Sequence, residues 1–266
     1  MNITAILYAA LALGGLGVLF GAVLSFADKK FAVAADERVS RVREALPGAN
    51  CAACGYTGCD AFAQAIVDGE ARASGCVPGG AACVSVIAGI MGVEAEKVTP
   101  MVAKVICQGE SGVAKPRYEY IGLKSCQQAA GMAGGPKRCP YACVGLGDCV
   151  NACAFGTLKV ENGLARVDEE KCTACGMCAS VCPRRSIRVM PRDAGVTVRC
   201  LNRDGGKEAR AACAKACIAC GRCEKECAAG AIAVADGCAR IDVEKCVRCG
   251  KCAAVCPMGC VTVAGK

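Results

Sequence analysis

The spacing of the cysteines constrains this chain more than any other feature of its sequence. Two segments, KCTACGMCASVCP (171–183) and KCVRCGKCAAVCP (245–257), share the run Cys-x2-Cys-x2-Cys-x3-Cys-Pro. A shift of 74 residues superimposes nine cysteines without a gap. The first copy comprises Cys126, Cys139, Cys143, Cys149, Cys153, Cys172, Cys175, Cys178 and Cys182, and the second begins at Cys200 and ends at Cys256. The C-terminal half is therefore an internal duplication.

This run has the spacing of bacterial ferredoxin-type [4Fe–4S] sites. Three thiolates on one tight loop reach one cluster, and the fourth, at the start of a helix, reaches its neighbour. Zinc held by four thiolates needs two separate pairs of thiols, so the run favours iron–sulfur. In the second copy the partner run is CIACGRCEKEC (217–227). The predicted ligand sets there are Cys217, Cys220, Cys223 and Cys256, and Cys246, Cys249, Cys252 and Cys227.

The first copy departs from this pattern at Leu146, which stands where the second copy has Cys220. The flanking thiols of Cys143 and Cys149 remain, and Cys139 is the nearest spare donor. We therefore predict one cluster bound by Cys139, Cys143, Cys149 and Cys182 and its partner bound by Cys153, Cys172, Cys175 and Cys178. A three-iron cluster or a lost site is the alternative.

Another group of cysteines precedes the duplication. The stretch CAACGYTGC (51–59) and a cysteine 17 residues beyond it predict a fifth [4Fe–4S] site, for which spacing alone leaves zinc as the alternative. Its ligands would be Cys51, Cys54, Cys59 and Cys76. Five clusters use 20 of the 27 cysteines, and most of the others are expected to be small buried apolar residues. A sixth cluster stays open, with the ligands Cys107, Cys126, Cys200 and Cys213.

Composition excludes several classes of protein. The cysteine count is odd, the gaps are short, and no cleavable-looking signal peptide is present, so the thiols indicate a reducing compartment rather than disulfides. The absence of histidine excludes Cys/His zinc sites and histidine acid–base catalysis. A [4Fe–4S] cluster with four thiolates carries a charge of about −2, and five would add about −10. The net charge of +8 is thus read as compensation for clusters, with no nucleic-acid partner.

The N-terminus predicts a membrane anchor. Residues Ile3–Phe26 carry no charge over 24 positions, which as a helix span about 36 Å, enough for the hydrocarbon core of a bilayer. Asp28, Lys29 and Lys30 follow directly. Positive charge after the span predicts a single-pass protein of the cell membrane with its bulk on the cytoplasmic side. A signal peptide is the alternative, but the basic N-terminal region that it needs is missing.

The predicted fold class is α+β. Asn162-Gly163 and Asp236-Gly237 each lie between two short apolar runs and predict tight hairpin turns. Residues 35–46 predict a helix, and 81–106 a packed helical segment. We divide the chain into a transmembrane anchor (1–27), a small helical [4Fe–4S] domain (28–110) and two tandem two-cluster ferredoxin-like modules (111–192 and 193–266).

The order of these parts resembles the B subunit of the Rnf complex, the ion-translocating ferredoxin:NAD+ oxidoreductase of bacterial and archaeal membranes. The stretches CAACGYTGCDAFAQAI and GCVPGG carry the resemblance, and YEYIGLKSC, GGPKRC and CVGLGDCVNAC are similar to the longer clostridial and acetogen-type subunits. The resemblance implies that the N-terminal cysteines bind the subunit's own [4Fe–4S] cluster. It also implies an assembly with other membrane subunits and with flavin- and NAD-binding subunits, coupled to Na+ or H+ transport.

We therefore expect an electron-transfer subunit of a translocase. It would accept electrons from reduced ferredoxin and relay them toward flavin-bearing, NAD+-reducing partners, whereas ions would move in other subunits. The chain alone would be an electron carrier without acid–base catalytic residues. The alternatives are a polyferredoxin subunit of a membrane hydrogenase or another reductase, and a zinc scaffold for protein assembly.

Overall fold

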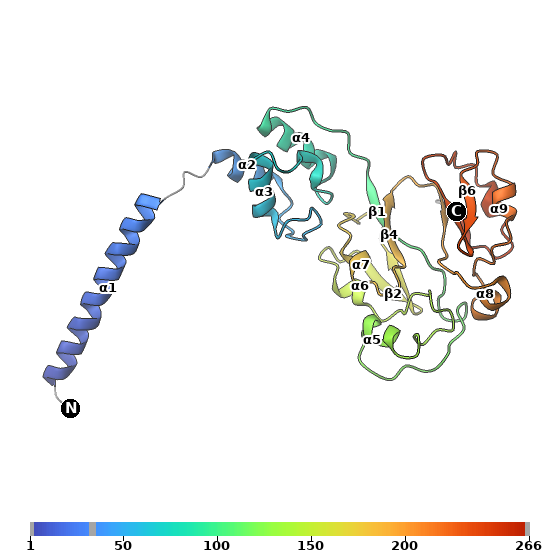
Figure 1. The fold of residues 1–266 in the computed structure, drawn as a ribbon, viewed down its shortest axis with the longest axis horizontal. Coiled ribbons are helices and arrows are strands. Elements are labelled where there is room, and N and C mark those ends of the chain that lie inside the picture. The colour runs from blue at the N-terminus through green and yellow to red at the C-terminus, as the bar shows by residue number, and fades with distance from the viewer. Residues whose placement is uncertain (1–2, 32–35, 264–266) are drawn as a thin grey trace.

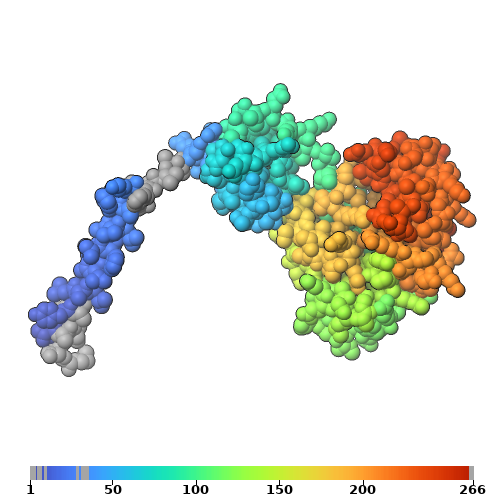
Figure 2. Space-filling model, viewed as in Figure 1, coloured from blue at the N-terminus to red at the C-terminus, as the bar shows by residue number. Residues whose placement is uncertain are grey.

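The computed structural model describes residues 3–31 and 36–263. Residues 1–2, 32–35 and 264–266, which belong to the predicted anchor, N-terminal domain and second module, lie outside the described residues. A long helix, α1 (Ile3–Phe31), stands apart from the rest of the chain. Three folded parts follow it in sequence order and form successive lobes of the molecule (Figure 1, Figure 2).

The first lobe is helical. It contains α2 (Glu37–Ala45), α3 (Cys59–Val67), the short 3-10 helix η1 (Ala73–Gly75) and α4 (Gly80–Met91). The helix predicted over residues 35–46 is confirmed as α2, whose first turn is capped by the Asp36 carboxylate. This carboxylate accepts a hydrogen bond from the Arg38 amide at 2.9 Å. The three large helices bury Val42, Phe62 and Ile87 against one another.

The segment after α4 differs from the prediction of a packed helical segment over 81–106. The helix α4 ends at Gly92, which adopts a left-handed conformation with φ of +69°. The chain then becomes extended and forms the strand β1 (Met101–Val105). Val102 and Ala103 of this strand are fully buried, so the apolar pattern that indicated a helix belongs in part to a buried strand.

The two remaining lobes are modules with the same order of elements. The first contains β1, α5 (Cys126–Gly131), α6 (Asp148–Asn151), β2 (Leu158–Glu161), β3 (Leu164–Val167), α7 (Met177–Ser180) and β4 (Ile187–Pro191). The second contains β5 (Val196–Val198), α8 (Gly206–Ala212), α9 (Arg222–Lys225), β6 (Ile232–Ala235), β7 (Cys238–Ile241), α10 (Lys251–Ala254) and β8 (Val261–Val263). Each module has two antiparallel strand pairs, β1–β4 with β2–β3 and β5–β8 with β6–β7.

Both hairpin turns are confirmed. Glu161 pairs with Leu164, so Asn162 and Gly163 form the turn between β2 and β3 with φ of +49° and +67°. The second module repeats this arrangement between β6 and β7, where the turn residues have φ of +50° and +77°. Positive φ at both central positions is the geometry that Asn-Gly and Asp-Gly favour.

The first module begins earlier than predicted. Because β1 pairs with β4, the strand belongs to this module although it lies within the segment 28–110 that was assigned to the N-terminal domain. Val105 faces Ile187 in one module, and Val198 faces Val261 in the other. The strand β1 is therefore the structural counterpart of β5, which the gapless repeat alignment did not reveal.

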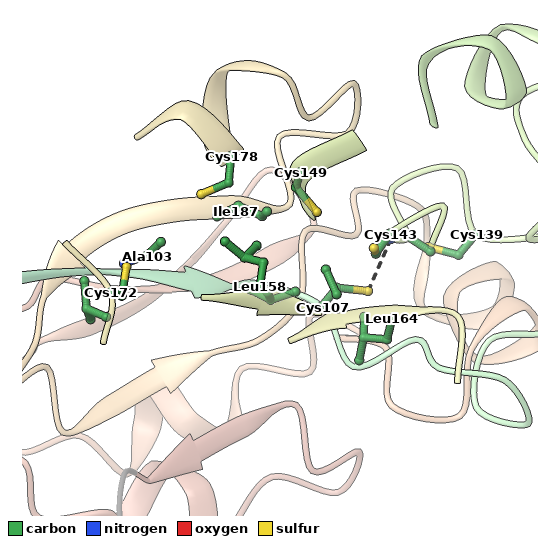
Figure 3. Packing of buried hydrophobic residues seen from close by; sticks show 14 of the residues in the cluster. Ala103, Cys107, Cys139, Cys143, Cys149, Leu158, Leu164, Cys172, Cys178 and Ile187 are labelled. Atoms are coloured by element: carbon green, nitrogen blue, oxygen red, sulfur yellow. Dashed lines mark hydrogen bonds between the residues drawn. The ribbon is translucent and has the colours of Figure 1, made fainter. Parts of the chain in front are cut away.

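Buried thiols make up much of the core of both modules, and Figure 3 shows the core of the first. In the first module, six cysteines pack around Leu158, Leu164 and Ile187. They are Cys107, Cys139, Cys143, Cys149, Cys172 and Cys178. The helices α6 and α7 are only four residues long and cannot be stable alone. The fold of each module therefore depends on what holds its cysteine loops together.

The helix α1 exposes large apolar side chains along the part whose side chains are described, among them Leu13, Val18 and Phe26. Within the described residues, no helix combines the length and the apolar character that a candidate membrane span needs.

Candidate metal centres

Three of the five predicted ligand sets each line a single cavity. The first cavity lies in the N-terminal domain and is lined by Cys51, Cys54, Cys59 and Cys76. The other two lie in the second module and are lined by Cys217, Cys220, Cys223 and Cys256, and by Cys227, Cys246, Cys249 and Cys252. The fold thus brings together cysteines from separate runs, as a shared cluster requires.

The backbone of the cysteine loops explains this convergence. In the loop Cys217–Cys223, Ala219 and Gly221 have φ of +53° and +70°. The loop Cys246–Cys252 repeats these values at Arg248 and Gly250, with φ of +59° and +75°. Left-handed residues before and after the middle cysteine curl the chain, so that its three thiols face one cavity. The short helix that follows each loop carries the third thiol.

The set Cys153, Cys172, Cys175 and Cys178 of the first module also lies together. Burial raises the pKa of the Cys178 thiol to about 11, and the nearby thiols of the other three raise it as well. The amides of Ala103 and Ala174 donate to the Cys172 sulfur at 3.5 and 3.4 Å. Backbone amide donors to cysteine sulfur are a feature of iron–sulfur sites.

Around Leu146 the loop keeps its shape although it lacks the thiol. Gly145 and Gly147 have φ of +84° and +96°, and the matching residues Ala219 and Gly221 of the second module are also left-handed. A Cβ on Gly145 would lie 2.2 Å from the Gly163 carbonyl oxygen, so this position requires glycine. The leucine side chain packs against a cluster of buried residues that includes Cys126.

The thiol of Cys126 lies near this site, and the predicted ligand Cys139, which shares the core cluster of Cys143 and Cys149, also lies near thiols of the second module. Burial raises the pKa of the Cys149 thiol to about 12, and the nearby thiols that raise it further are those of Cys143, Cys126, Cys182 and Cys178. Burial also raises the pKa of Cys139, to about 11, but the thiols acting on it are those of Cys107, Cys200 and Cys213. The arrangement brings together Cys126, Cys143, Cys149 and Cys182.

Asp148 places Cys126 beside Cys149. Its carboxylate accepts hydrogen bonds from the amides of Cys126 and Gln127 at 2.9 and 3.1 Å and from the Ser125 hydroxyl at 3.2 Å. The start of α5 is thereby fastened to the start of α6. The spacing rules of cysteine runs could not reveal this role, because Cys126 lies 17 residues before Cys143.

Nothing among the described residues resembles a site for a single metal ion: no three or more histidine, cysteine, aspartate or glutamate side chains are grouped to bind one. The donor sets described above consist of thiols alone. Several of these sulfurs accept backbone amides, for example Cys227 from Ala231 at 3.3 Å and Cys182 from Ser186 at 3.4 Å. Thiols in such loops, with amide donors to sulfur, fit iron–sulfur clusters.

Family models of iron–sulfur proteins match four segments of the chain. A model described as a putative Fe–S cluster matches residues 46–78. A model described as a 4Fe–4S binding domain matches residues 165–188 and 239–262, and another of the same description matches 214–230. These matches support [4Fe–4S] clusters in the N-terminal domain and in both modules.

The chain is also similar to three curated proteins over most of its length. It is 46% identical to the B subunit of the Na+-translocating ferredoxin:NAD+ oxidoreductase complex of Acetobacterium woodii, over 88% of this chain and 70% of the relative. It is 39% identical to the B subunit of the ion-translocating oxidoreductase complex of Methanosarcina acetivorans, over 88% and 89%. It is 37% identical to the B subunit of the proton-translocating ferredoxin:NAD+ oxidoreductase complex of Clostridium ljungdahlii, over 76% of this chain and 72% of the relative.

Proposed function

Because the chain belongs to the B-subunit family of Rnf complexes, the ion-translocating ferredoxin:NAD+ oxidoreductases, we propose that it takes single electrons from reduced ferredoxin and delivers them to flavin- and NAD-binding subunits. It is an electron-transfer subunit of a membrane-associated complex and works with the other subunits of that complex. The family matches establish [4Fe–4S] clusters as its cofactors. Coupling to Na+ or H+ transport would then occur in partner subunits.

We assign the cysteine ligands of five clusters. Four sets are those predicted from sequence, one in the N-terminal domain, one in the first module and two in the second. For the set around Leu146, we replace Cys139 by Cys126, because Cys126 is the thiol that lies beside Cys149. A [4Fe–4S] cluster supplies one-electron redox chemistry that side chains lack. The chain supplies buried thiolates and amide donors to sulfur, which set the reduction potential.

The observation that carries the proposal is that the thiol sets follow one another as neighbours. Burial raises the pKa of Cys175, and among the nearby thiols that add to this effect is Cys51 of the N-terminal domain. The nearby thiol of Cys178 in turn raises the pKa of Cys149, which belongs to the next set. In the second module, the last cysteine of each run serves the other set, so those two sets adjoin. These contacts allow electrons to move in short steps from the N-terminal domain through the first module, and between the two sets of the second module.

The anchor is a further part of the proposal. The uncharged run Ile3–Phe26 and the exposed apolar side chains of α1 support its burial in a membrane, with residues 36–263 on the cytoplasmic side. We expect the full chain, produced without its partner subunits, to sediment with membranes, and a chain that lacks residues 1–27 to stay in the supernatant with its iron content unchanged. Membrane binding by the shortened chain would contradict this assignment.

The function is tested on the complex purified from membranes under anaerobic conditions through a tag on this chain. We expect it to contain flavin and to reduce NAD+ when reduced ferredoxin is added, while the broad absorbance near 400 nm that [4Fe–4S] clusters give is bleached. Recovery of a hydrogenase metal without flavin or NAD+ reduction would instead support a polyferredoxin subunit of a hydrogenase.

A further inference from the structure

Four cysteines outside the five assigned sets meet in a cavity between the two modules. They are Cys107, Cys139, Cys200 and Cys213. Three of them are at most 9% exposed, and Cys200 is intermediate. Burial raises the pKa of Cys213, and the thiols of Cys107 and Cys200 add to this effect. The thiols of Cys107, Cys200 and Cys213 likewise add to the rise in the pKa of Cys139. The four residues therefore form one group.

The four residues are two equivalent pairs, one from each module. Cys139 and Cys213 match in the sequence repeat. Cys107 and Cys200 match in the structure, since each follows the inner end of an equivalent strand, β1 or β5. The residue before each of them donates its amide to the residue that precedes the paired strand. Ile106 donates to the Ser186 carbonyl before β4 at 2.6 Å, and Arg199 donates to the Cys260 carbonyl before β8 at 2.7 Å. The cavity therefore lies where equivalent parts of the two modules meet.

Backbone pairing between the modules fixes this cavity. The Lys115 amide donates to the Ala212 carbonyl at 2.9 Å, and the Ala214 amide donates to the Val113 carbonyl at 3.0 Å. These bonds enclose Cys213 on both sides. The Arg199 side chain donates to the carbonyls of Val105 and Cys107 at 3.2 and 3.3 Å and joins the modules from the other direction.

The sulfurs of Cys107 and Cys200 each accept hydrogen bonds from two backbone amides. Cys107 accepts the amide of Gly109 at 3.2 Å and that of Cys143 at 3.5 Å, and Figure 3 shows the second of these bonds. Cys200 accepts those of Asn202 and Cys217 at 3.4 and 3.2 Å. Amide donors to a cysteine sulfur are a feature of iron–sulfur sites, where they tune the reduction potential.

Two other buried cysteines donate hydrogen bonds through their thiols instead of accepting them. Cys83 donates its thiol to the Ala45 carbonyl at 3.3 Å, and Cys238 donates to the Cys200 carbonyl at 3.3 Å. Leu164 occupies the position of Cys238 in the first module, so this site needs an apolar side chain and not a thiol. The direction of hydrogen bonding therefore distinguishes candidate ligands, which accept backbone amides, from buried cysteines that only pack in the core.

Positive side chains are available to balance a negatively charged group here. Arg199 and Lys215 line the cavity, and Lys137 lies near enough to Cys213 to oppose the rise of its pKa. The Lys137 ammonium also donates to the carbonyls of Gly109 and Gly163, both at 2.6 Å. Since a cluster with four thiolates carries about −2, these cations reduce the cost of burying it.

We propose that Cys107, Cys139, Cys200 and Cys213 bind a sixth [4Fe–4S] cluster, which joins the electron path of the first module to that of the second. The inference deepens the proposed function and rests on it. Cys107 contacts the amide of Cys143, a ligand of the preceding set, and Cys200 contacts that of Cys217, a ligand of the next. The site thus lies between the two modules' clusters.

The test is a count of iron and acid-labile sulfide in the full chain, reconstituted anaerobically with ferrous iron and sulfide. Six clusters require about 24 irons per chain, and Cys213→Ala and Cys107→Ala should each lower this number to about 20. Quantified electron paramagnetic resonance of the reduced protein should lose about one cluster spin per chain in each variant. The matched control Cys238→Ala, which removes a buried sulfur from the same region, should keep the wild-type count.

A wild-type count of about 20 that Cys213→Ala leaves unchanged would overturn the sixth cluster while the five assigned sets and the proposed function stand. One zinc ion per chain that is lost in Cys213→Ala would also overturn it. If both variants fold poorly, the wild-type count alone still decides between five and six clusters. A wild-type protein without iron would contradict the proposed function as well, so the two failures are distinguishable.

Discussion

Removal of iron and sulfide is expected to unfold both modules while the helix α1 persists. The described part of the modules contains four two-stranded sheets and, in the cysteine loops, helices of four residues. Neither element is stable alone in water. Thiols occupy the positions in the core that larger apolar side chains fill in other small domains.

The magnitudes favour complete unfolding of the modules over local loosening. A structural metal site contributes on the order of 10 kcal/mol to folding in small metal-binding domains. The entire stability of a typical domain is about 5–15 kcal/mol. In the second module, half of the main core cluster consists of cysteines, namely Cys217, Cys223, Cys238, Cys252 and Cys260. Loss of two clusters should therefore exceed what the remaining apolar contacts can offset.

Hydrogen exchange of the full chain, before and after anaerobic removal of iron, measures this effect. We expect the amides of β2, β3, β6 and β7 to lose their protection, whereas helix α1 keeps helical circular dichroism. Retention of a cooperative unfolding transition by the iron-free modules would show that the apolar core alone specifies the fold.

The second large effect is expected for Cys149→Ala in the assembled complex. Cys149 lies between Cys178 of one thiol set and Cys143 and Cys126 of its own set. Loss of this cluster removes one step from the sequence that runs from the N-terminal domain through the first module. We therefore predict that NAD+ reduction by reduced ferredoxin falls to background.

The readouts separate an interrupted path from a damaged protein. Iron content should fall by about four per chain, and NADH oxidation by an artificial acceptor at the flavin-bearing subunits should not change. Cys238→Ala is again the control, with wild-type rates expected. Full ferredoxin-dependent activity in a Cys149→Ala complex that has lost this iron would exclude the cluster from the electron path.

Much of the fold and of the ligand sets could be predicted because both depend on local sequence. Asn162-Gly163 and Asp236-Gly237 specify hairpins through their own backbone preferences, which the duplication shows twice. In the same way, the x2 gaps of Cys217–Cys223 and Cys246–Cys252 place three thiols on one loop, whatever the remainder of the chain does.

The parts that sequence did not reveal depend on contacts between distant segments. The repeat alignment matched Cys126 with Cys200, but the strand pairing makes Cys107 the counterpart of Cys200. The first module has a longer connection here, with 32 residues from Cys107 to Cys139 against 13 from Cys200 to Cys213. In the assignment that we propose, this longer connection lets Cys126 replace the thiol that is missing at Leu146, and Cys139 then serves another set.

X-ray absorption at the iron edge of the full chain, purified without oxygen, tests the account most directly. If thiolate loops bind [4Fe–4S] clusters, each iron has sulfur neighbours and a second shell of scattering from other irons at short range. Iron without such a second shell, or zinc–sulfur scattering in protein that contains no iron, would contradict it.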